Sequence, residues 1–376
     1  MNRYVRYGIR ARLGVALCAL IGSLVFAELL FRFLLTTDCS LVRRVRKPDL
    51  YASYFGDNDY WKLQYLWIKQ FLPPAHPHPL LGWTGDFSRD TYLHNRTKEL
   101  NGRRPVLLYG DSFAQCLQVR CFQDILNEDP AFNAQYFMLN YGVGGYGMDQ
   151  SYLLLRESID LYDNPFVIFS MYWENIDRNL LSVRTGQKPY FRMVDGTLCL
   201  QGVPINSDSE AFFMDNPPAI PSYLWRLLLY LTTRETAYES PRRREEKKVL
   251  ASAILTSVIA ECRSRNLDLI FIVFYDHWAG PLGWRGSFLK EYFKGRGVPY
   301  IWSVDVIRQK ADGVPLRDLI SPETGHPTAR YNSFIAEEIK RHVLLFPRMH
   351  ENEGDPSNRS QAHRPPVSGQ ELLGVP

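Results

Sequence analysis

Short apolar runs of strand length recur through the middle of this chain and constrain its fold more than any other feature. Residues 106–109, 136–139, 166–172 and 269–274 are such runs, bounded by Gly, Pro, Asn or charged residues. Continuous apolar runs of this length are typical of strands buried on both faces of a parallel sheet. A helical pattern at residues 148–161 follows the second run. The sequence therefore predicts an α/β fold built on a parallel sheet.

The first run leads directly into Gly110-Asp111-Ser112-Phe113, so a serine stands where a strand would end and a helix begin. In open α/β sheets, ligands bind in the crevice outside the carboxyl ends of the strands. A helix N-terminus there offers free backbone N–H groups and the positive end of its dipole. We expect Gly110 to permit the tight turn and Ser112 to face the crevice, although Ser112 also suits a plain helix cap.

Three more segments follow in a recognisable order. A glycine-rich loop at residues 142–147 follows the second run, Trp173-Glu174-Asn175 follows the third, and Glu323-Thr324-Gly325-His326-Pro327 precedes a helical pattern at residues 329–343. With the Gly-Asp-Ser turn, these segments resemble the four sequence blocks of the SGNH (GDSL) hydrolase superfamily, in its membrane-anchored bacterial type. The resemblance implies a three-layer α/β/α sandwich with a central parallel sheet.

The resemblance also implies roles for individual residues. Ser112 matches the catalytic nucleophile, and His326, followed by Pro327, matches the general base. Gly145, five positions after Asn140, matches the glycine whose backbone N–H binds the oxyanion, together with the N–H of Ser112 itself.

Two positions depart from the family pattern. The third block usually reads Gly-x-Asn-Asp, so we assign Asn175 as the oxyanion side chain, with Glu174 as the alternative. Glu323 stands three residues before His326, where the family has aspartate. Its side chain is one methylene longer. Either Glu323 completes a catalytic triad, or Ser112 and His326 act as a dyad.

These residue types belong together for a chemical reason. A serine hydroxyl is a poor nucleophile at neutral pH, so a histidine with a pKa near neutrality must take its proton and return it to the leaving group. A carboxylate beside the histidine would fix its tautomer. Each preorganised donor to the oxyanion contributes about 3 to 4 kcal/mol at comparable sites.

Other polar residues carry weaker predictions. His277 follows the run at residues 269–274 and therefore also points to this sheet edge, as a candidate for substrate contact. His76 and His78 lie among prolines in an extended segment. No Cys or His cluster has metal-ligand spacing, and the glycines at 142–147 lack the Lys-Ser/Thr ending of a phosphate loop. We expect no metal, nucleotide or other cofactor.

Residues 13–35 form an apolar stretch long enough to cross a bilayer, preceded by Arg3, Arg6, Arg10 and Arg12. This predicts an uncleaved anchor with a cytoplasmic N-terminus (residues 1–12) and an extracytoplasmic, for example periplasmic, catalytic domain. The alternative is a signal peptide, but no small-x-small cleavage site follows residue 35. Glu28 and Arg32 lie four apart inside the stretch and can pair. Basic residues at 43–47, on the other side of the stretch, reduce the charge difference that sets the orientation of the helix in the membrane.

The composition is that of an ordinary globular protein. The chain has 376 residues, 45% of them hydrophobic and 22% charged, and its net charge is +4. Part of that charge comes from the basic clusters beside the membrane stretch, so we expect no nucleic-acid partner. Six cysteines are too few for a disulfide scaffold. Cys116 and Cys121 can pair in an oxidising compartment or remain buried thiols.

The motifs and the composition together divide the chain after residue 35 into three segments. Residues 36–104 form a membrane-proximal segment, with an aromatic helix at 60–71 and a Leu-Gly-Trp motif at Trp83 that packs against the core. Residues 105–346 are the catalytic domain, and residues 347–376 a disordered tail. An insertion at about 185–240 contains a hairpin around Asp195-Gly196 and an apolar helix at 223–231, and is the expected substrate wall. Charges at 242–248 are expected to face solvent.

The sequence thus predicts a serine esterase, an acyl hydrolase that acts on O-acyl groups of cell-surface carbohydrate, or on a small ester, through an acyl-serine intermediate. An O-acyltransferase would use the same intermediate. A non-catalytic polysaccharide-binding or export factor on the same fold is the alternative from another class, supported by the departures at Glu323 and at Glu174. The sequence does not identify the protein partners.

Overall fold

The computed structural model describes residues 2–37, 40–68, 77–85, 97–117, 119–184, 186–206, 208–233, 240–275, 283–311, 313–315 and 318–345. Its side chains are described from residue 12 onward. His76, His277 and the tail predicted at 347–376 lie outside these ranges, so the predictions made for them stay predictions.

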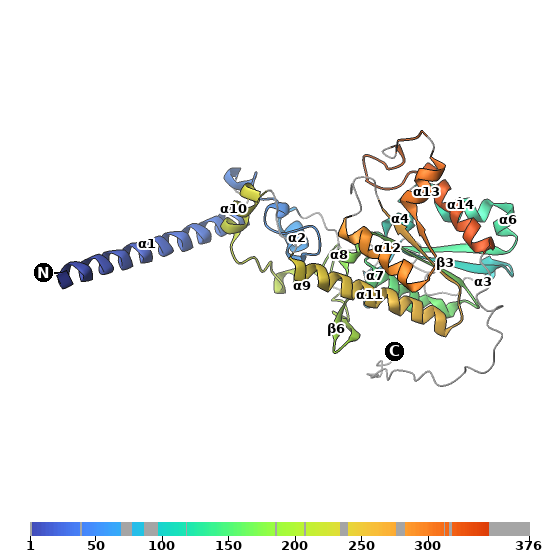
Figure 1. Ribbon diagram of the computed structural model, residues 1–376, viewed down its shortest axis with the longest axis horizontal. Helices are drawn as coiled ribbons and strands as arrows, with labels where there is room; N and C mark the ends of the chain where they lie inside the picture. Colours follow the sequence, from blue (N-terminus) through green and yellow to red (C-terminus); the bar gives the residue numbers. More distant parts are fainter. Residues whose placement is uncertain are drawn as a thin grey trace.

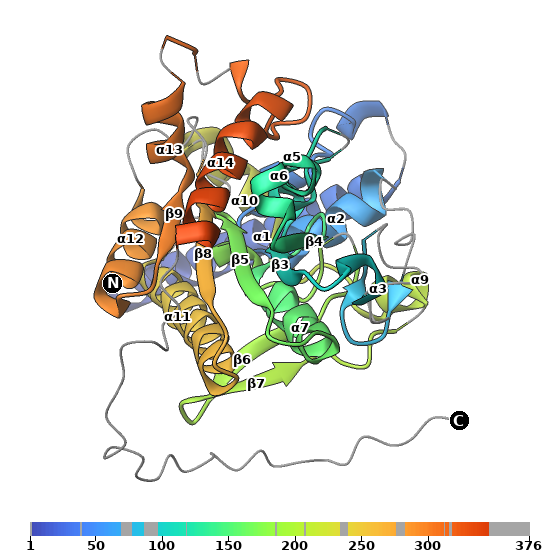
Figure 2. The same ribbon diagram turned by 90° about the vertical axis from the view of Figure 1, so that its right-hand side faces the viewer.

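A five-stranded parallel sheet lies at the centre of the chain (Figure 2). Its order is β4-β3-β5-β8-β9, and every neighbouring pair is parallel. The strands are β3 (Arg104–Gly110), β4 (Tyr136–Gly142), β5 (Phe166–Tyr172), β8 (Leu269–Phe274) and β9 (Tyr300–Trp302). The first four coincide with the predicted apolar runs, which confirms the parallel sheet. The short edge strand β9 was not predicted.

Successive residues of each strand enter two different cores, and this alternation makes three layers. Leu107 and Tyr109 of β3 pack with the helices on one face, whereas Val106 and Leu108 pack with those on the other. The first face is covered by α7 (Met148–Ser158), α11 (Pro241–Ser264) and α12 (Trp284–Arg296). The second is covered by α4 (Ser112–Gln115), α5 (Phe122–Glu128), α6 (Pro130–Asn133), α13 (Ser303–Lys310) and α14 (Ala329–Leu345). The predicted α/β/α arrangement is confirmed.

The segment before the sheet is built from short elements. They are η1 (Ser40–Val42), η2 (Pro48–Leu50), α2 (Asn58–Leu63), the π-helical turn η3 (Gln64–Ile68), the antiparallel pair β1 (Pro77–His78) and β2 (Gly82–Trp83), and α3 (Thr97–Leu100). Between β4 and β8 lie η4 (Ile159–Leu161), α8 (Asn175–Arg178), β6 (Tyr190–Val194), β7 (Thr197–Gln201), α9 (Ser209–Asp215) and α10 (Tyr223–Thr233). The antiparallel pair β6-β7 turns at Asp195 (φ 49°) and Gly196 (φ 77°), as the hairpin prediction required.

Helix α1 (Asn2–Thr36) extends away from the rest of the chain (Figure 1). Its stretch Arg12–Thr36 has a mean hydropathy of 2.3, and none of its most apolar part is buried by the protein. The helix is therefore long and apolar enough to cross a bilayer. A signal sequence near the N-terminus can meet the same criteria of length and hydropathy.

One prediction about the surface is wrong. Lys247 belongs to the charged run at the start of α11, which was expected to face solvent, but only 1% of it is exposed. Its Nζ pairs with Oδ1 of Asp177. The same carboxylate accepts two hydrogen bonds from Arg285, at 2.7 Å on Oδ2 and at 2.8 Å on Oδ1. The buried carboxylate of Asp177 requires such partners, and Lys247 is the cation of the run that the helix turns inward.

Candidate active site

Ser112 is the first residue of α4, two positions after the end of β3. The helix cap is Asp111, whose carboxylate accepts a hydrogen bond from the Phe113 N–H at 3.0 Å. Ser112 is thus not the cap. Gly110 also differs from expectation, because it has no positive φ. A Cβ atom there would come within 2.0 Å of Ser170 Oγ, so glycine allows β5 to approach β3 closely.

His326 reaches Ser112 from the loop before α14. Its Nε2 lies 2.8 Å from Ser112 Oγ, although 214 positions separate the two residues. The imidazole ring also packs against the Phe113 ring, with centroids 5.2 Å apart. Burial is the main cause that lowers the pKa of His326 below its usual 6.5. The two residues predicted as nucleophile and base are therefore in contact, with the base neutral at pH 7.

The second ring nitrogen of His326 faces the backbone. Its Nδ1 lies 2.7 Å from the Thr324 carbonyl oxygen, which can only accept. Nδ1 therefore carries the proton, and Nε2 is free to accept the hydrogen bond from the Ser112 hydroxyl. Glu323 is exposed, and no hydrogen bond or ion pair joins it to His326 among the residues described. The backbone carbonyl occupies the place that a triad carboxylate would fill.

The glycine-rich loop lies beside α4. A Cβ atom on Gly142 would come within 2.5 Å of the backbone N of Gln115, so the loop packs directly under that helix. Gly145 has φ +87°, a conformation that favours glycine. It lines a cavity of about 460 Å³ together with Ser112 and His326. The predicted oxyanion glycine and the predicted nucleophile thus share one cavity.

The Leu-Gly-Trp motif supports this loop. Trp83 is only 5% exposed, as the packing prediction required, and its Nε1 donates to the Gly144 carbonyl at 3.0 Å. Its ring lies edge-on to Tyr146, whose hydroxyl donates to the Trp83 carbonyl. The glycine-rich loop is thus held by Trp83, a residue that precedes the central sheet in the chain.

Both candidates for the third block lie at the site, but in different places. Glu174 lines the cavity, and burial is the main cause that raises the pKa of its carboxyl. Asn175 does not line the cavity: it is fully buried, and its Oδ1 accepts from Nη1 of the cavity residue Arg178 at 3.0 Å. The Asn175 Nδ2 has no hydrogen-bond partner among the residues that the structure describes. A buried unpaired donor costs about 1 to 3 kcal/mol. This amide N–H is therefore available to donate a hydrogen bond to an oxyanion that forms within its reach.

Arg178 is a site residue that the sequence reasoning missed. Its Nη1 donates to Asp111 Oδ2 at 3.0 Å and to the Tyr146 carbonyl at 3.1 Å, and its Nη2 lies 3.3 Å from Glu174 Oε2. The guanidinium thus ties the serine turn, the glycine loop and the third block together. Glu174 and Arg178 stand four residues apart at the end of a predicted strand, and this spacing could have indicated the pair.

Two further residues of the cavity wall were also missed, and they come from outside the sheet. Tyr54 belongs to the membrane-proximal segment, and Arg184 follows α8. The Arg184 guanidinium lies over the Trp61 ring, 5.1 Å from its centroid, and burial lowers its pKa to about 10. Its Nε has no hydrogen-bond partner, and it forms no ion pair within the described part of the chain. Arg184 therefore presents a positive charge to the cavity.

The other candidate residues have structural roles where they are described. His78 Nδ1 accepts from the N–H groups of Leu80 and Leu81, at 3.3 and 3.1 Å, and so stabilises a turn. In the described ranges, no group of three or more His, Cys, Asp or Glu side chains is placed to hold a metal ion. Cys116 and Cys121 form a disulfide that closes a short loop just after α4.

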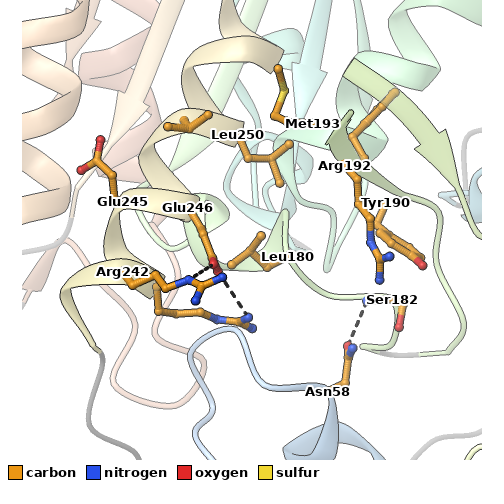
Figure 3. Close-up of a pocket in the computed structure, with 13 residues that line it drawn as sticks. Asn58, Leu180, Ser182, Tyr190, Arg192, Met193, Arg242, Glu245, Glu246 and Leu250 are labelled. Atoms are coloured by element: carbon orange, nitrogen blue, oxygen red, sulfur yellow. Dashed lines mark hydrogen bonds and ion pairs between the residues drawn. The ribbon is translucent and has the colours of Figure 1, made fainter. Parts of the chain in front are cut away.

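A larger cavity, of about 800 Å³, opens between the β6-β7 hairpin and the first turns of α11 (Figure 3). Arg242 and Arg243 both pair with Glu246 on its wall, which also includes Asn58 and Ser182. Neither Ser112 nor His326 lines it. Size therefore does not identify the reactive site here, and the smaller cavity with the serine and histidine is the candidate active site.

A serine at the carboxyl end of a parallel strand, hydrogen-bonded to an imidazole, is the arrangement that serine hydrolases use. Solved structures similar to this chain include Axe2, an acetylxylan esterase from Geobacillus stearothermophilus (10% identity, TM-score 0.37), which matches over 66% of this chain and 97% of that one. A member of the lipolytic protein G-D-S-L family from Veillonella parvula matches at 10% identity and TM-score 0.36, over 65% and 98%.

The esterase EstA from a Pseudoalteromonas species, inhibited by monoethylphosphonate, matches at 10% identity and TM-score 0.35, over 64% of this chain and 97% of that one. These low values describe a similar course of the chain and carry no argument about what this site does. No protein-family model and no curated protein matches the sequence.

Proposed function

We propose that this chain is a serine esterase that hydrolyses O-acyl esters through an acyl-serine intermediate. The observation that carries the proposal is the 2.8 Å contact of Ser112 Oγ with His326 Nε2, in a cavity that Gly145 also lines. The tautomer supports it, because the Thr324 carbonyl keeps the proton on Nδ1 and leaves Nε2 as the acceptor. The site residues belong to a catalytic domain that we place at residues 105–346.

The reaction follows from this geometry. Ser112 Oγ attacks the ester carbonyl carbon while its proton passes to His326 Nε2, and the carbonyl oxygen becomes an oxyanion. We assign the N–H groups of Ser112 and Gly145 and the Asn175 amide as the donors that bind it. The intermediate collapses as the C–O bond breaks and His326 returns the proton to the departing alcohol. Water then attacks the acyl-serine by the same steps, which releases the acid.

The imidazolium that forms during attack needs a partner. Its Nδ1–H donates to the Thr324 carbonyl, and the nearby Asp111 carboxylate favours the charged ring, although burial outweighs that effect in the resting state. Asp111 is itself held by Arg178. A dyad oriented by a backbone carbonyl is therefore the mechanism we propose, in place of a triad with Glu323.

Covalent labelling tests the proposal directly. A fluorophosphonate reacts only with an activated serine, so the full-length protein should be labelled on the peptide that contains Ser112. The alternative function, a non-catalytic carbohydrate-binding factor, predicts no labelling while the protein is folded. Labelling on any other serine would contradict the site assignment.

The pH dependence of kcat/KM should report the lowered pKa of His326. The base works only when neutral, so activity should rise with pH, with a midpoint below 6.5, and level off by about pH 7. Rates with a neutral nitrophenyl ester between about pH 4.5 and pH 8 measure this. Glu174 has a raised pKa and can titrate in the same range, so Glu174→Gln is the control. A midpoint above 6.5 in that variant would contradict the assignment.

Substitutions at positions 174 and 175 show which of the two side chains binds the oxyanion. Asn175→Ala should lower kcat by about 10²- to 10³-fold with little change in KM, because it removes a donor that acts in the transition state. Glu174→Gln keeps the size of the side chain and an oxygen that can accept from Arg178, so it should change kcat by less than about tenfold, roughly the net value of one ordinary hydrogen bond. The reverse order of effects would assign the oxyanion role to position 174.

We further propose that the substrate class is the O-acyl group of carbohydrate at the cell surface. The support is location, since α1 can cross a membrane and the Cys116–Cys121 disulfide is typical of an oxidising compartment outside the cytoplasm. An acyltransferase would form the same acyl-serine and pass it to a sugar hydroxyl instead of water. Release of free acid from an acylated polysaccharide, against transfer to an added acceptor, distinguishes these reactions.

The anchor should be retained in the mature protein. Phe31, Leu34 and Leu35 of α1 pack in a core cluster with Tyr51, so cleavage after the apolar stretch would remove part of that cluster. We expect the protein to stay in the membrane fraction after a high-salt wash and to keep residues 1–12. External protease should digest the domain in intact spheroplasts. An N-terminal sequence that begins near residue 38 would show a signal peptide instead.

A further inference from the structure

Helix α10 is apolar on both of its faces. Tyr223, Leu227 and Tyr230 on one face pack on a small core formed by the end of α1 and by residues 42–67. The opposite face presents Trp225, Leu228 and Leu231, which are 62%, 52% and 57% exposed. Apart from Arg226 and the two threonines at its end, α10 is apolar, and an apolar helix face is normally buried in protein or in lipid. No described residue of this chain covers the second face.

The start of α10 is fastened to α1 by a glutamate. Glu28 Oε1 accepts from the Tyr223 N–H at 2.9 Å, and Oε2 accepts from the Leu224 N–H at 3.1 Å and from Ser222 Oγ at 2.9 Å. Its carboxylate therefore satisfies N–H groups that the first turn of α10 leaves free. Figure 1 shows α10 beside the end of α1 that joins the rest of the chain.

Arg32 completes the attachment. Its Nε pairs with Glu28 Oε1 at 2.7 Å, as the sequence spacing predicted, and its Nη2 donates to the carbonyls of Ile220 and Pro221, at 2.8 and 2.6 Å. Both charges of the apolar stretch are thus engaged by the segment that begins α10. Charged side chains are tolerated at membrane depth when they are paired in this way.

The position of Glu28 sets the level of α10 relative to a membrane. A hydrocarbon core of about 30 Å takes about 20 helical residues, so a core that begins at Arg12 ends near Arg32, about one turn beyond Glu28. If α1 crosses the bilayer, the first turn of α10 is carried to the boundary between acyl chains and headgroups. Tryptophan and tyrosine side chains are enriched at that boundary.

We propose that α10 is a second membrane element, which lies in the bilayer interface beside α1 on the side of the catalytic domain. Its partner is the lipid itself, and Trp225, Leu228 and Leu231 face the acyl chains. The inference rests on the membrane anchor proposed above and is independent of the chemistry at Ser112. The two attached helices fix how the catalytic domain sits on the membrane, which a single anchor helix would not do.

Spin-label accessibility tests this in the full chain. The cysteines outside the Cys116–Cys121 disulfide are replaced by alanine, and single cysteines are placed at Leu228, at Val25 on the lipid-exposed side of α1, and at Val194 in the β6-β7 hairpin. Val25 and Val194 are 53% and 47% exposed, so all three sites accept a label without disturbing a core. Each labelled protein is reconstituted into phosphatidylcholine–phosphatidylglycerol vesicles, and collision rates with oxygen and with a water-soluble nickel chelate are compared.

The label at Leu228→Cys should resemble that at Val25→Cys, with high oxygen and low nickel accessibility, whereas Val194→Cys should be accessible to nickel. A water-like label at 228 beside a lipid-like label at 25 overturns the proposal for α10 and leaves the anchor intact. A water-like label at 25 overturns the anchor itself. Strong spin–spin broadening at 228, lost on dilution with unlabelled protein, would show a second copy of the chain in place of lipid and also overturn the proposal.

Discussion

Ser112→Ala is expected to lower kcat for a short-chain nitrophenyl ester by about three orders of magnitude or more, while the fold is unchanged. The serine alone forms the covalent intermediate, and it does not cap α4, so its hydroxyl has no role in holding the helix. Steady-state rates of the purified full-length protein in detergent measure the effect, and circular dichroism checks the fold.

A second serine provides the matched control. Ser182 lies on the wall of the larger cavity and not in the cavity with His326, so Ser182→Ala should keep wild-type activity. Retained turnover in Ser112→Ala, with the control equally active, would remove the proposed mechanism. Loss of activity in both variants would point to a structural effect and would equally count against a specific role for Ser112.

His326→Asn is expected to reduce kcat by about 10³-fold or more, because no other described base contacts Ser112. Glu323→Gln, in contrast, should stay within a few-fold of wild type, since the Glu323 side chain is exposed and the Thr324 carbonyl holds the imidazole. A triad would behave differently, because loss of the carboxylate charge costs up to about 10⁴-fold at tightly coupled sites. The kcat values of both variants decide between the two mechanisms.

Glu323→Asp is the control for these variants. A triad in which the longer side chain adapts predicts that aspartate works as well as glutamate and that glutamine fails. The dyad predicts that all three residues at position 323 give similar rates. A drop of more than about tenfold in Glu323→Gln alone would restore the triad.

Four of the five strands of the central sheet, and helices such as α7 and α14, could be predicted because their signals are local. Residues 106–109 and 166–172 are apolar runs with clear ends, and the observed β3 and β5 match them closely. The hairpin could be predicted because Asp195 and Gly196 favour the positive φ that a two-residue turn needs. The contact of Ser112 with His326 came from the family resemblance and the chain order, and the structure has the two side chains in contact.

The side-chain contacts of the site could not be predicted, because they depend on which residues from distant parts of the chain meet in the fold. The spacing left open whether Glu323 orients His326, whereas in the structure the contact of the ring Nδ1 is with the Thr324 carbonyl. The sequence likewise placed Lys247 on a solvated face, because nothing nearby indicates that Asp177, 70 positions away, needs a cation. Arg178 was missed because its partner Asp111 belongs to another segment.

Tyr51 and Tyr54 stand three positions apart yet touch different parts of the molecule. Tyr51 packs on α10 and α1 through the rings of Tyr223 and Phe31, at 5.1 and 6.5 Å, and Tyr54 lines the cavity that holds Ser112. Three residues span at most about 10 Å, so a short, packed segment separates the cavity that holds Ser112 from the helices α1 and α10. With the anchor proposed above, an enzyme built this way would have a limited radius of action, because it would reach ester groups near the bilayer surface and not those far from it.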